Sequence, residues 1–294
     1  MSARRASGVR RGERTAVRSA RRRGVHDRRR PLAGRRILVT RPRAQSQVLC
    51  DVLRRLGARP LAVPAIGIAP PAARGPLDRA LRSLGRYDWV VLTSANGARA
   101  CLARARALRL DLRTFSRPRW AAVGPATAAA LRAAGMRVAL IPSRYLTAAI
   151  AHELPVAPGQ RILLLRTTAA TPALADALGA RGAVVDQVAA YRTRLAPRPL
   201  SPRLRRLIDA RAIDTVLFTS ASTVRGLVRM LGRRRGSLRT MTVACIGPVC
   251  AAAAEREGLR PQIVAGEHTT RGLINALLAA ASKGAHHVES RAAH

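Results

Sequence analysis

The chain contains the same short pattern twice, and this internal repeat limits the folds that it can adopt. The first copy reads VLTSANG from Val91 to Gly97, and the second reads VLFTSAST from Val216 to Thr223, about 125 residues further on. Each copy is a short apolar run that ends in Thr-Ser and is followed by a segment with helical periodicity. A repeat at this spacing predicts two copies of one structural unit, each with a buried strand that stops where a helix begins.

The similarity between the two copies extends well beyond this pattern. The paired segments are residues 35–66 with 160–193 (which begin RRILVT and QRILLL), 120–141 with 243–264 (which begin WAAVGPAT and VACIGPVC), and 143–154 with 267–278. Strand-like and helix-like segments alternate in each copy, with about five expected strands, and the stretch 60–68 reads as one of them. This alternation requires parallel sheets covered by helices on both faces. We therefore predict an α/β fold of two doubly wound parallel-sheet domains that arose by internal duplication.

The composition restricts the classes of partner. Hydrophobic residues make up 48% of the 294-residue chain but aromatic residues only 2%, so we expect two domain cores built from Ala, Leu and Val. The formal charge of +39 suits nucleic acid, an anionic membrane surface or an acidic small molecule. The chain has no recognised nucleic-acid motif, few aromatic residues to stack on bases, and no apolar run that would span a membrane. We expect no specific nucleic acid and no membrane as partner.

The four cysteines and the two ends of the chain predict little chemistry. The cysteines form no CxxC pair and have no histidine at metal-ligand spacing, so we expect no metal site and a location in the reducing cytoplasm.

Residues 1–34 are rich in Arg and poor in large apolar residues, which predicts a disordered basic tail. An organelle transit peptide, a polyanion-binding arm and an over-extended start codon remain open as its origin. Residues 282–294 also read as a loose tail.

The repeated Thr-Ser pairs are the first candidates for a binding site. They fall where a strand stops and a helix begins, so free backbone N–H groups and small hydroxyl groups would lie side by side there. Such a site suits anionic groups of a ligand, because ligands of doubly wound sheets bind at the carboxyl ends of the strands. The alternative is that Ser94 and Ser220 only cap helices. The duplication favours the binding site.

A longer series of segments resembles one known family. In order, ILVTRP, TSANG, AVGPATAAAL, LLLR, VAAYRT, FTSAST and CIGPV resemble uroporphyrinogen-III synthases, from about residue 35 to 278. No single segment is specific, but their order and spacing are. The resemblance implies a discontinuous domain of residues 35–66 and 197–281, a second domain of 75–188, and a two-strand linker of 67–74 and 189–196. Pattern alone does not exclude two sequential domains.

The resemblance also implies a reaction. Members of this family cyclise hydroxymethylbilane, a linear tetrapyrrole with eight carboxylates, to uroporphyrinogen III in haem biosynthesis. The substrate loses its terminal hydroxyl to give an azafulvenium cation, and ring D is attacked at its substituted carbon and inverted through a spiro intermediate. Unassisted closure gives the type I isomer, so positioning is a large part of catalysis. No cofactor is implied. A monomer is expected, and a hand-over of substrate from the preceding enzyme of the pathway stays open.

The family motifs assign roles to individual residues. Tyr191 in VAAYRT would help the hydroxyl to leave, with the packing of a linker strand as the alternative. Thr127 in GPAT would bind a substrate carboxylate or cap a helix. Cys250 in GPVC stands where the family usually has Thr, and a thiol is a weak donor. The other expected substrate-binding residues lie at strand ends and helix starts: Arg41, Ser94, Asn96, Arg166, Ser220, Ser222, Thr223, Gly247 and Thr269. For each Arg a solvated position is the alternative. A two-lobed non-enzymatic binder of an anionic small molecule is the competing function.

Overall fold

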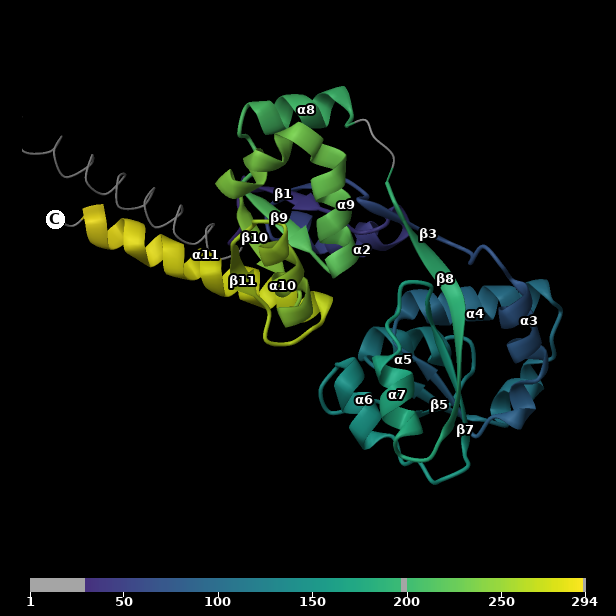
Figure 1. Cartoon of the computed structure of the whole chain (residues 1–294). Helices are drawn as coiled ribbons and strands as arrows, with labels where there is room; N and C mark the ends of the chain where they lie inside the picture. Colours follow the sequence, from purple (N-terminus) through teal and green to yellow (C-terminus); the bar gives the residue numbers. More distant parts are fainter. Residues whose placement is uncertain (1–29, 197–199, 293–294) are drawn as a thin grey trace, which may run out of the picture. The chain divides into compact units, whose positions relative to one another are not determined.

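The computed structural model describes residues 30–196 and 200–292 of the chain. Within these ranges the chain folds as two compact units (Figure 1). Unit 1 contains the chain up to Ile66 and again from Leu195, and unit 2 is Gly67–Arg194. The chain therefore passes twice between the units, and each unit has its own sheet.

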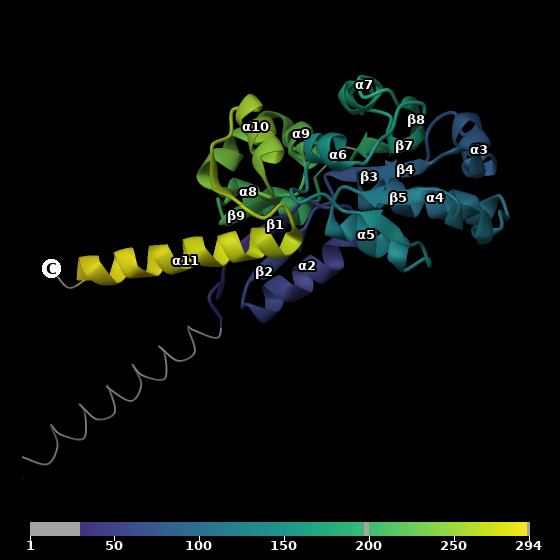
Figure 2. The ribbon, with the colours of Figure 1, turned by 90° about the horizontal axis from the view of Figure 1, so that it is seen from below.

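Unit 1 is built on a five-stranded parallel sheet in the order β11-β10-β9-β1-β2. Its strands are β1 (Arg36–Val39), β2 (Arg59–Ala62), β9 (Thr215–Phe218), β10 (Thr242–Cys245) and β11 (Pro261–Val264). Its helices are α2 (Arg43–Arg55), α8 (Pro202–Asp209), α9 (Ala221–Leu231), α10 (Pro248–Arg256) and α11 (Thr270–Ala292), with the 3-10 helix η3 (Gly232–Thr240). Helices α8, α9 and α10 cover one face of the sheet, and α2 and α11 cover the other (Figure 2).

Unit 2 contains a six-stranded sheet in the order β3-β8-β7-β4-β5-β6. Its strands are β3 (Ile66–Ala69), β4 (Trp89–Leu92), β5 (Arg119–Ala122), β6 (Val138–Leu140), β7 (Arg161–Thr167) and β8 (Val184–Leu195). Its helices are α3 (Gly75–Arg82), α4 (Ala95–Ala107), α5 (Pro125–Arg132), α6 (Thr147–Glu153) and α7 (Ala173–Gly179), with 3-10 helices η1 (Leu84–Arg86) and η2 (Leu112–Ser116). Helices α3, α4 and α5 pack on one face, and α6 and α7 on the other (Figure 2).

The sixth strand corrects the expectation of five strands per copy. The stretch 60–68, expected as one strand, is divided into β2 and β3, which belong to different sheets. Pro64 lies between them. Proline has no N–H to donate to a neighbouring strand, so the ladder breaks at this point.

The internal duplication is visible in a pair of aspartates that the sequence patterns did not single out. In unit 1, the Asp214 carboxylate accepts the Arg36 N–H at 2.7 Å, and the Asp214 N–H donates to the Arg36 carbonyl at 3.0 Å. In unit 2, the Asp88 carboxylate accepts the Arg161 N–H at 2.8 Å, and the Asp88 N–H donates to the Arg161 carbonyl at 2.9 Å. Each aspartate thus fixes the start of two adjacent parallel strands in the same way. The prediction of a duplicated doubly wound fold is confirmed.

The ends of the folded chain differ from the expectation. Leu32 is fully buried against α2 and its N–H donates to the Leu56 carbonyl at 3.0 Å, so residues 30–34 belong to unit 1 and not to a tail. Burial of this side chain and two backbone hydrogen bonds, from Leu32 to Leu56 and from Gly34 to Gly57, together hold the turn on unit 1. Helix α11 continues to Ala292, past residue 282 where a loose tail was expected. Residues 1–29, most of the expected basic tail, and the expected tail residues 293 and 294 lie outside the described residues. None of the described helices combines the length and the apolar character that crossing a membrane requires.

Candidate functional site

The predicted site residues gather at the carboxyl ends of the strands in both sheets. In unit 2 they follow β4 and β5 or lie near the ends of β7 and β8: Ser94, Asn96, Thr127, Arg166 and Tyr191. In unit 1 they follow β1, β9, β10 and β11: Arg41, Ser220, Ser222, Thr223, Gly247, Cys250 and Thr269. Because the strands of each sheet run parallel, each set shares one edge of its sheet.

In unit 2 the structure brings Tyr191 and Ser94 together. The Tyr191 hydroxyl lies 3.0 Å from Ser94 Oγ, a hydrogen-bonding distance, although 97 residues separate the two in the chain. Ser94 has extended backbone at φ −155° and caps α4, because its Oγ also accepts the Gly97 N–H at 3.1 Å. The capping alternative is therefore true for Ser94, but the same oxygen also reaches the predicted catalytic residue.

A bulge in β8 puts Tyr191 on the face where Ser94 lies. Arg166 pairs with Ala189 and the next residue, Thr167, pairs with Tyr191, so Ala190 is one extra residue in β8. Side chains alternate along a strand, and without the bulge Tyr191 would share the face of Ala189. With it, Ala190 and Tyr191 both pack into the core under α3, α4 and α5. Sequence spacing alone gives no sign of this shift.

Burial controls the acidity of Tyr191. The side chain is 7% exposed, and burial raises the pKa of its phenol above the ordinary value, while the Ser94 hydrogen bond and the positive charge of Arg166 act in the opposite direction. The phenol is therefore protonated at neutral pH. It holds a proton that it can donate.

Arg166 is buried, which excludes the solvated alternative for this residue. It is 8% exposed, and its Nη1 donates to the Thr171 carbonyl at 2.8 Å and to Gln187 Oε1 at 3.1 Å. Its Nε is also buried and has no partner among the described residues. Burial lowers the pKa of Arg166, and the neighbouring Tyr191 acts in the opposite direction. Gln187 was missed in the sequence because the register of β8 on β7 cannot be read from local patterns.

Thr127 lies in the first turn of α5 but does not cap it. The N-cap is Gly124, whose carbonyl accepts the Thr127 N–H at 3.0 Å. The capping alternative for Thr127 is therefore wrong. The residue is nearly buried, at 4% exposed.

In unit 1 the start of α9, directly after β9, forms a complete capping box. Ser220 Oγ accepts the Thr223 N–H at 3.3 Å, and Thr223 Oγ1 accepts the Ser220 N–H at 3.2 Å. The Thr223 hydroxyl donates to the Ser220 carbonyl at 2.7 Å and is buried, which favours a structural role for Thr223. Ser222 Oγ lies 3.0 Å from Ser220 Oγ.

The turn after β10 is tightly packed. Gly247 is the N-cap of α10, and a Cβ there would come within 2.6 Å of the His268 ring, so only glycine fits without a shift. Cys250 is buried in the first turn of α10, against Cys245. The interaction between the two thiols lowers the pKa of Cys250 and raises that of Cys245, and burial acts to raise both.

Two further site residues, Arg41 and Thr269, follow β1 and precede α11. Arg41 Nη1 donates to Thr270 Oγ1 at 2.8 Å. Thr269 Oγ1 accepts the Gly272 N–H at 3.0 Å and lies 3.1 Å from Glu267 Oε1, so Thr269 orders the first turn of α11.

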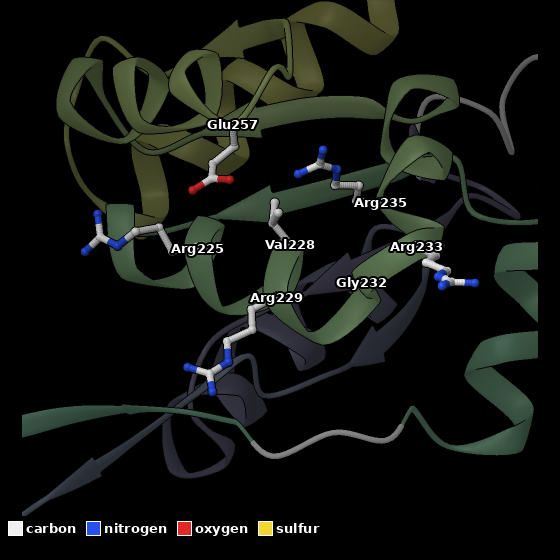
Figure 3. Close-up of a pocket in the computed structure, with 7 residues that line it drawn as sticks. All are labelled: Arg225, Val228, Arg229, Gly232, Arg233, Arg235 and Glu257. Carbon is white, nitrogen blue, oxygen red and sulfur yellow. The ribbon is translucent and has the colours of Figure 1, made fainter.

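Unit 1 also contains a pocket of about 520 Å³ that none of the predicted site residues lines (Figure 3). It lies against α9, η3 and Glu257, the residue that follows α10. Its lining residues are Arg225, Val228, Arg229, Gly232, Arg233, Arg235 and Glu257. Figure 3 shows the side chains of Arg225, Arg229 and Arg233 directed away from Glu257. Across the described ranges, no group of three His, Cys, Asp or Glu side chains is placed to hold a metal ion.

Comparison with known proteins identifies the family. The family model described as uroporphyrinogen-III synthase HemD matches residues 47–275. The uroporphyrinogen-III synthase of Synechococcus elongatus is 30% identical over 261 residues, which cover 84% of this chain and 96% of that protein. The porphyrin biosynthesis protein HemD of Ruminiclostridium josui is 31% identical over 252 residues, 84% of this chain, and the chain spans about half of that protein's length, at 49%.

Solved structures show the same fold. A mutant uroporphyrinogen III synthase from Thermus thermophilus aligns with a TM-score of 0.59 and 22% identity, covering 85% of this chain and 100% of that one. The uroporphyrinogen-III synthetase of Helicobacter pylori aligns with a TM-score of 0.56 and 16% identity, over 83% of this chain and 99% of that one. The structural match supports the two-domain α/β architecture. Together with the matching family model and the similar sequences, it shows that this chain belongs to the uroporphyrinogen-III synthase family.

Proposed function

We propose that this chain is itself a uroporphyrinogen-III synthase, which closes hydroxymethylbilane to uroporphyrinogen III with inversion of ring D. The observation that carries the proposal is the buried Tyr191 hydroxyl, 3.0 Å from Ser94 Oγ at the carboxyl edge of the unit 2 sheet. A protonated phenol at this edge supplies an acid for the first step of the reaction. Membership of the family supports the assignment of the substrate.

In the first step, Tyr191 acts as the general acid. Its proton moves to the hydroxyl oxygen of the substrate, the carbon–oxygen bond breaks, and the bonding electrons leave with water. The methylene carbon becomes cationic, and the adjacent pyrrole nitrogen shares the charge as the azafulvenium. The substituted carbon of ring D bonds to this methylene carbon and forms the spiro intermediate, and the original bond between that ring carbon and its other methylene bridge then breaks, which regenerates an azafulvenium. The free α-carbon of ring D bonds to the released methylene, and the proton lost from that α-carbon restores the phenol. The sum is loss of one water from the substrate.

The other residues hold the substrate so that the substituted carbon of ring D meets the cation. Each unit offers hydroxyl, amide and guanidinium donors at the carboxyl edge of its own sheet, and such donors are suited to acetate and propionate groups. In unit 2 we propose Asn96, Thr127 and the Nε of Arg166, which has no partner among the described residues, as these donors, whereas Ser94, predicted in the same set, is bonded to Tyr191. In unit 1 we propose Arg41, Ser220, Ser222 and Thr269 as these donors. We propose that the other predicted residues, Thr223, Gly247 and Cys250, shape the same strand edge, because Thr223 and Cys250 are buried and Gly247 has no side chain. Many such contacts fix one conformation, which is the main requirement of this reaction.

The setting of the enzyme is also a proposal. We propose domains of residues 35–66 with 197–281 and of 75–188, with 67–74 and 189–196 as linkers. We propose a monomer in the cytoplasm, consistent with four buried free cysteines, and keep a hand-over from the preceding enzyme open.

The test is to incubate the purified protein with freshly made hydroxymethylbilane and to resolve the type I and type III products. A synthase gives mostly type III, at a rate proportional to protein concentration. A non-enzymatic binder of anionic molecules would leave the type I product and, by retaining the substrate, slow its appearance. Type I as the sole product from folded protein would refute the proposal.

A further inference from the structure

The Ser94 hydroxyl can take part in only a few hydrogen bonds, as donor or as acceptor. A serine hydroxyl offers one hydrogen and two lone pairs. One lone pair is taken by the Gly97 N–H at 3.1 Å, in the cap of α4. One hydrogen and one lone pair remain, and the Tyr191 hydroxyl at 3.0 Å is the neighbour that they meet.

The direction of this hydrogen bond decides where the Tyr191 proton points. If Tyr191 donates, its proton faces Ser94 and is unavailable to a substrate. If Ser94 donates, the Tyr191 proton is free to face outward. The Gly97 N–H polarises the Ser94 oxygen, and hydrogen bonds in a chain strengthen one another, so the Ser94 hydroxyl becomes a better donor. A donor also stabilises a phenolate more than a neutral phenol, because charge-assisted hydrogen bonds are stronger.

We infer that Ser94 is a positioning residue that donates its hydroxyl proton to the Tyr191 oxygen, so that Tyr191 directs its own proton to the departing hydroxyl of the substrate. Ser94 then stabilises the phenolate that remains. This role rests on the proposed function, and it differs from direct binding of a substrate carboxylate by Ser94.

The second copy of the repeat shows that the cap alone does not require the tyrosine. Ser220 caps α9 as Ser94 caps α4, with an Oγ that accepts the N–H three residues on. There the neighbour of the serine oxygen is Ser222 Oγ, at 3.0 Å. An N-cap serine of this kind therefore does not require a tyrosine neighbour, and the contact with Tyr191 is particular to unit 2.

Three substitutions at Ser94 separate donation from capping. Ser94→Ala removes both, and we expect the rate to fall about 10- to 100-fold, the usual cost of a lost hydrogen bond to a charged group. Ser94→Asp keeps a good N-cap but has no proton to donate when ionised, so we expect a similar loss in a well-folded protein. Ser94→Thr keeps the hydroxyl and should retain most of the activity. In all slowed variants the product shifts towards type I.

A matched control comes from a cap outside the site. Ser201 caps α8 in the same way, with Oγ accepting the Leu204 N–H at 3.2 Å. Ser201→Ala should lower the melting temperature about as much as Ser94→Ala and leave rate and isomer ratio unchanged. A rate loss in Ser201→Ala equal to that in Ser94→Ala would mean that stability alone explains the effect, and would overturn the inference.

A double-mutant cycle tests whether Ser94 acts through Tyr191. In a Tyr191→Phe background, Ser94→Ala should cost nothing further in rate or isomer ratio, because the atom on which it acts is gone. An additional loss of tenfold or more would show that Ser94 contacts the substrate directly. A fully active Tyr191→Phe protein would instead defeat the proposed role of Tyr191, whatever Ser94 does.

A spectroscopic readout does not depend on activity. The chain has 3 tyrosines, so a protein labelled with ¹³C at tyrosine Cζ gives a simple spectrum, and the signal missing in Tyr191→Phe identifies Tyr191. Ser94→Ala should move that signal, and Ser201→Ala should leave it in place. An unmoved Tyr191 signal in Ser94→Ala would show that the hydrogen bond is absent in solution and would overturn the inference.

Discussion

Replacing Tyr191 by Phe removes one oxygen from the proposed acid and keeps nearly all of the packing. The ring stays in the core under α3, α4 and α5, and the lost contact is the one with Ser94 Oγ at 3.0 Å. Ser94 Oγ still accepts the Gly97 N–H, so the cap of α4 remains. The substitution therefore separates the chemistry of the hydroxyl from the burial of the ring.

A packing role and an acid role of Tyr191 predict different effects of Tyr191→Phe on stability and on rate. Losing one neutral hydrogen bond costs about 1 kcal/mol of unfolding free energy. With a total stability of about 5–15 kcal/mol, the variant stays folded at the assay temperature. Losing a positioned proton donor costs about 10²–10⁴-fold in rate, which is roughly 3–5 kcal/mol in the activation barrier. The loss of rate should thus exceed anything that the small loss of stability explains.

The assay is the initial rate and the ratio of type III to type I product, beside a thermal melting curve. As the enzyme slows, unassisted closure continues, and the product should shift towards type I. Tyr191→Ala is the contrasting variant, since removing the ring costs about 3–5 kcal/mol of stability through lost burial. Wild-type rate and isomer ratio in a well-folded Tyr191→Phe protein would leave Tyr191 with a packing role alone.

Two further predictions concern the scaffold. Gly226→Ala improves the helix propensity of α9 by about 1 kcal/mol, but the added Cβ would press on the Ala65 carbonyl oxygen, and overpacking costs about 1–3 kcal/mol or more, so urea unfolding should show a net loss. Gly179→Ala, where an added Cβ meets nothing within 4 Å, is the control, and equal stabilities of the two variants would contradict the packing reasoning. Arg104 donates to the two Asp78 carboxylate oxygens at 2.7 and 2.6 Å, and this lowers the pKa of Asp78. The pair therefore stabilises the fold above the unfolded-state pKa of about 4, and the stabilisation is lost as pH falls through the lower folded-state pKa. Asp78→Asn should melt lower than wild type at pH 7 with a smaller gap near pH 3, and a gap that does not narrow would count against this linkage.

Sequence alone was sufficient where the determining interactions are local. Alternating strand and helix patterns gave the doubly wound fold, because each pattern reports which face of a segment is buried. The Thr-Ser pairs gave the helix starts at Ser94 and Ser220, since an N-cap bond reaches only three residues along the chain. Placing the site residues at strand ends followed from the parallel topology that such patterns require.

The arrangement within each sheet was decided by tertiary structure. Sequence pattern did not exclude two sequential domains, whereas in the structure β9 pairs with β1 across more than half of the chain. Periodicity shows that a strand is buried but not which strand it pairs with, because the pairing depends on long-range packing. Leu32 is a smaller case: its burial depends on α2 and not on its own polar surroundings.

The surroundings of Tyr191, the proposed acid, were likewise decided by the tertiary structure. The VAAYRT motif named Tyr191 as a candidate, but its contact with Ser94 depends on the extra residue in β8, and the Arg166–Gln187 hydrogen bond depends on the register of β7 and β8. A register shift of one residue moves every following side chain to the other face of the sheet. That shift arises from the packing of the whole sheet, and no local pattern in the strand specifies it.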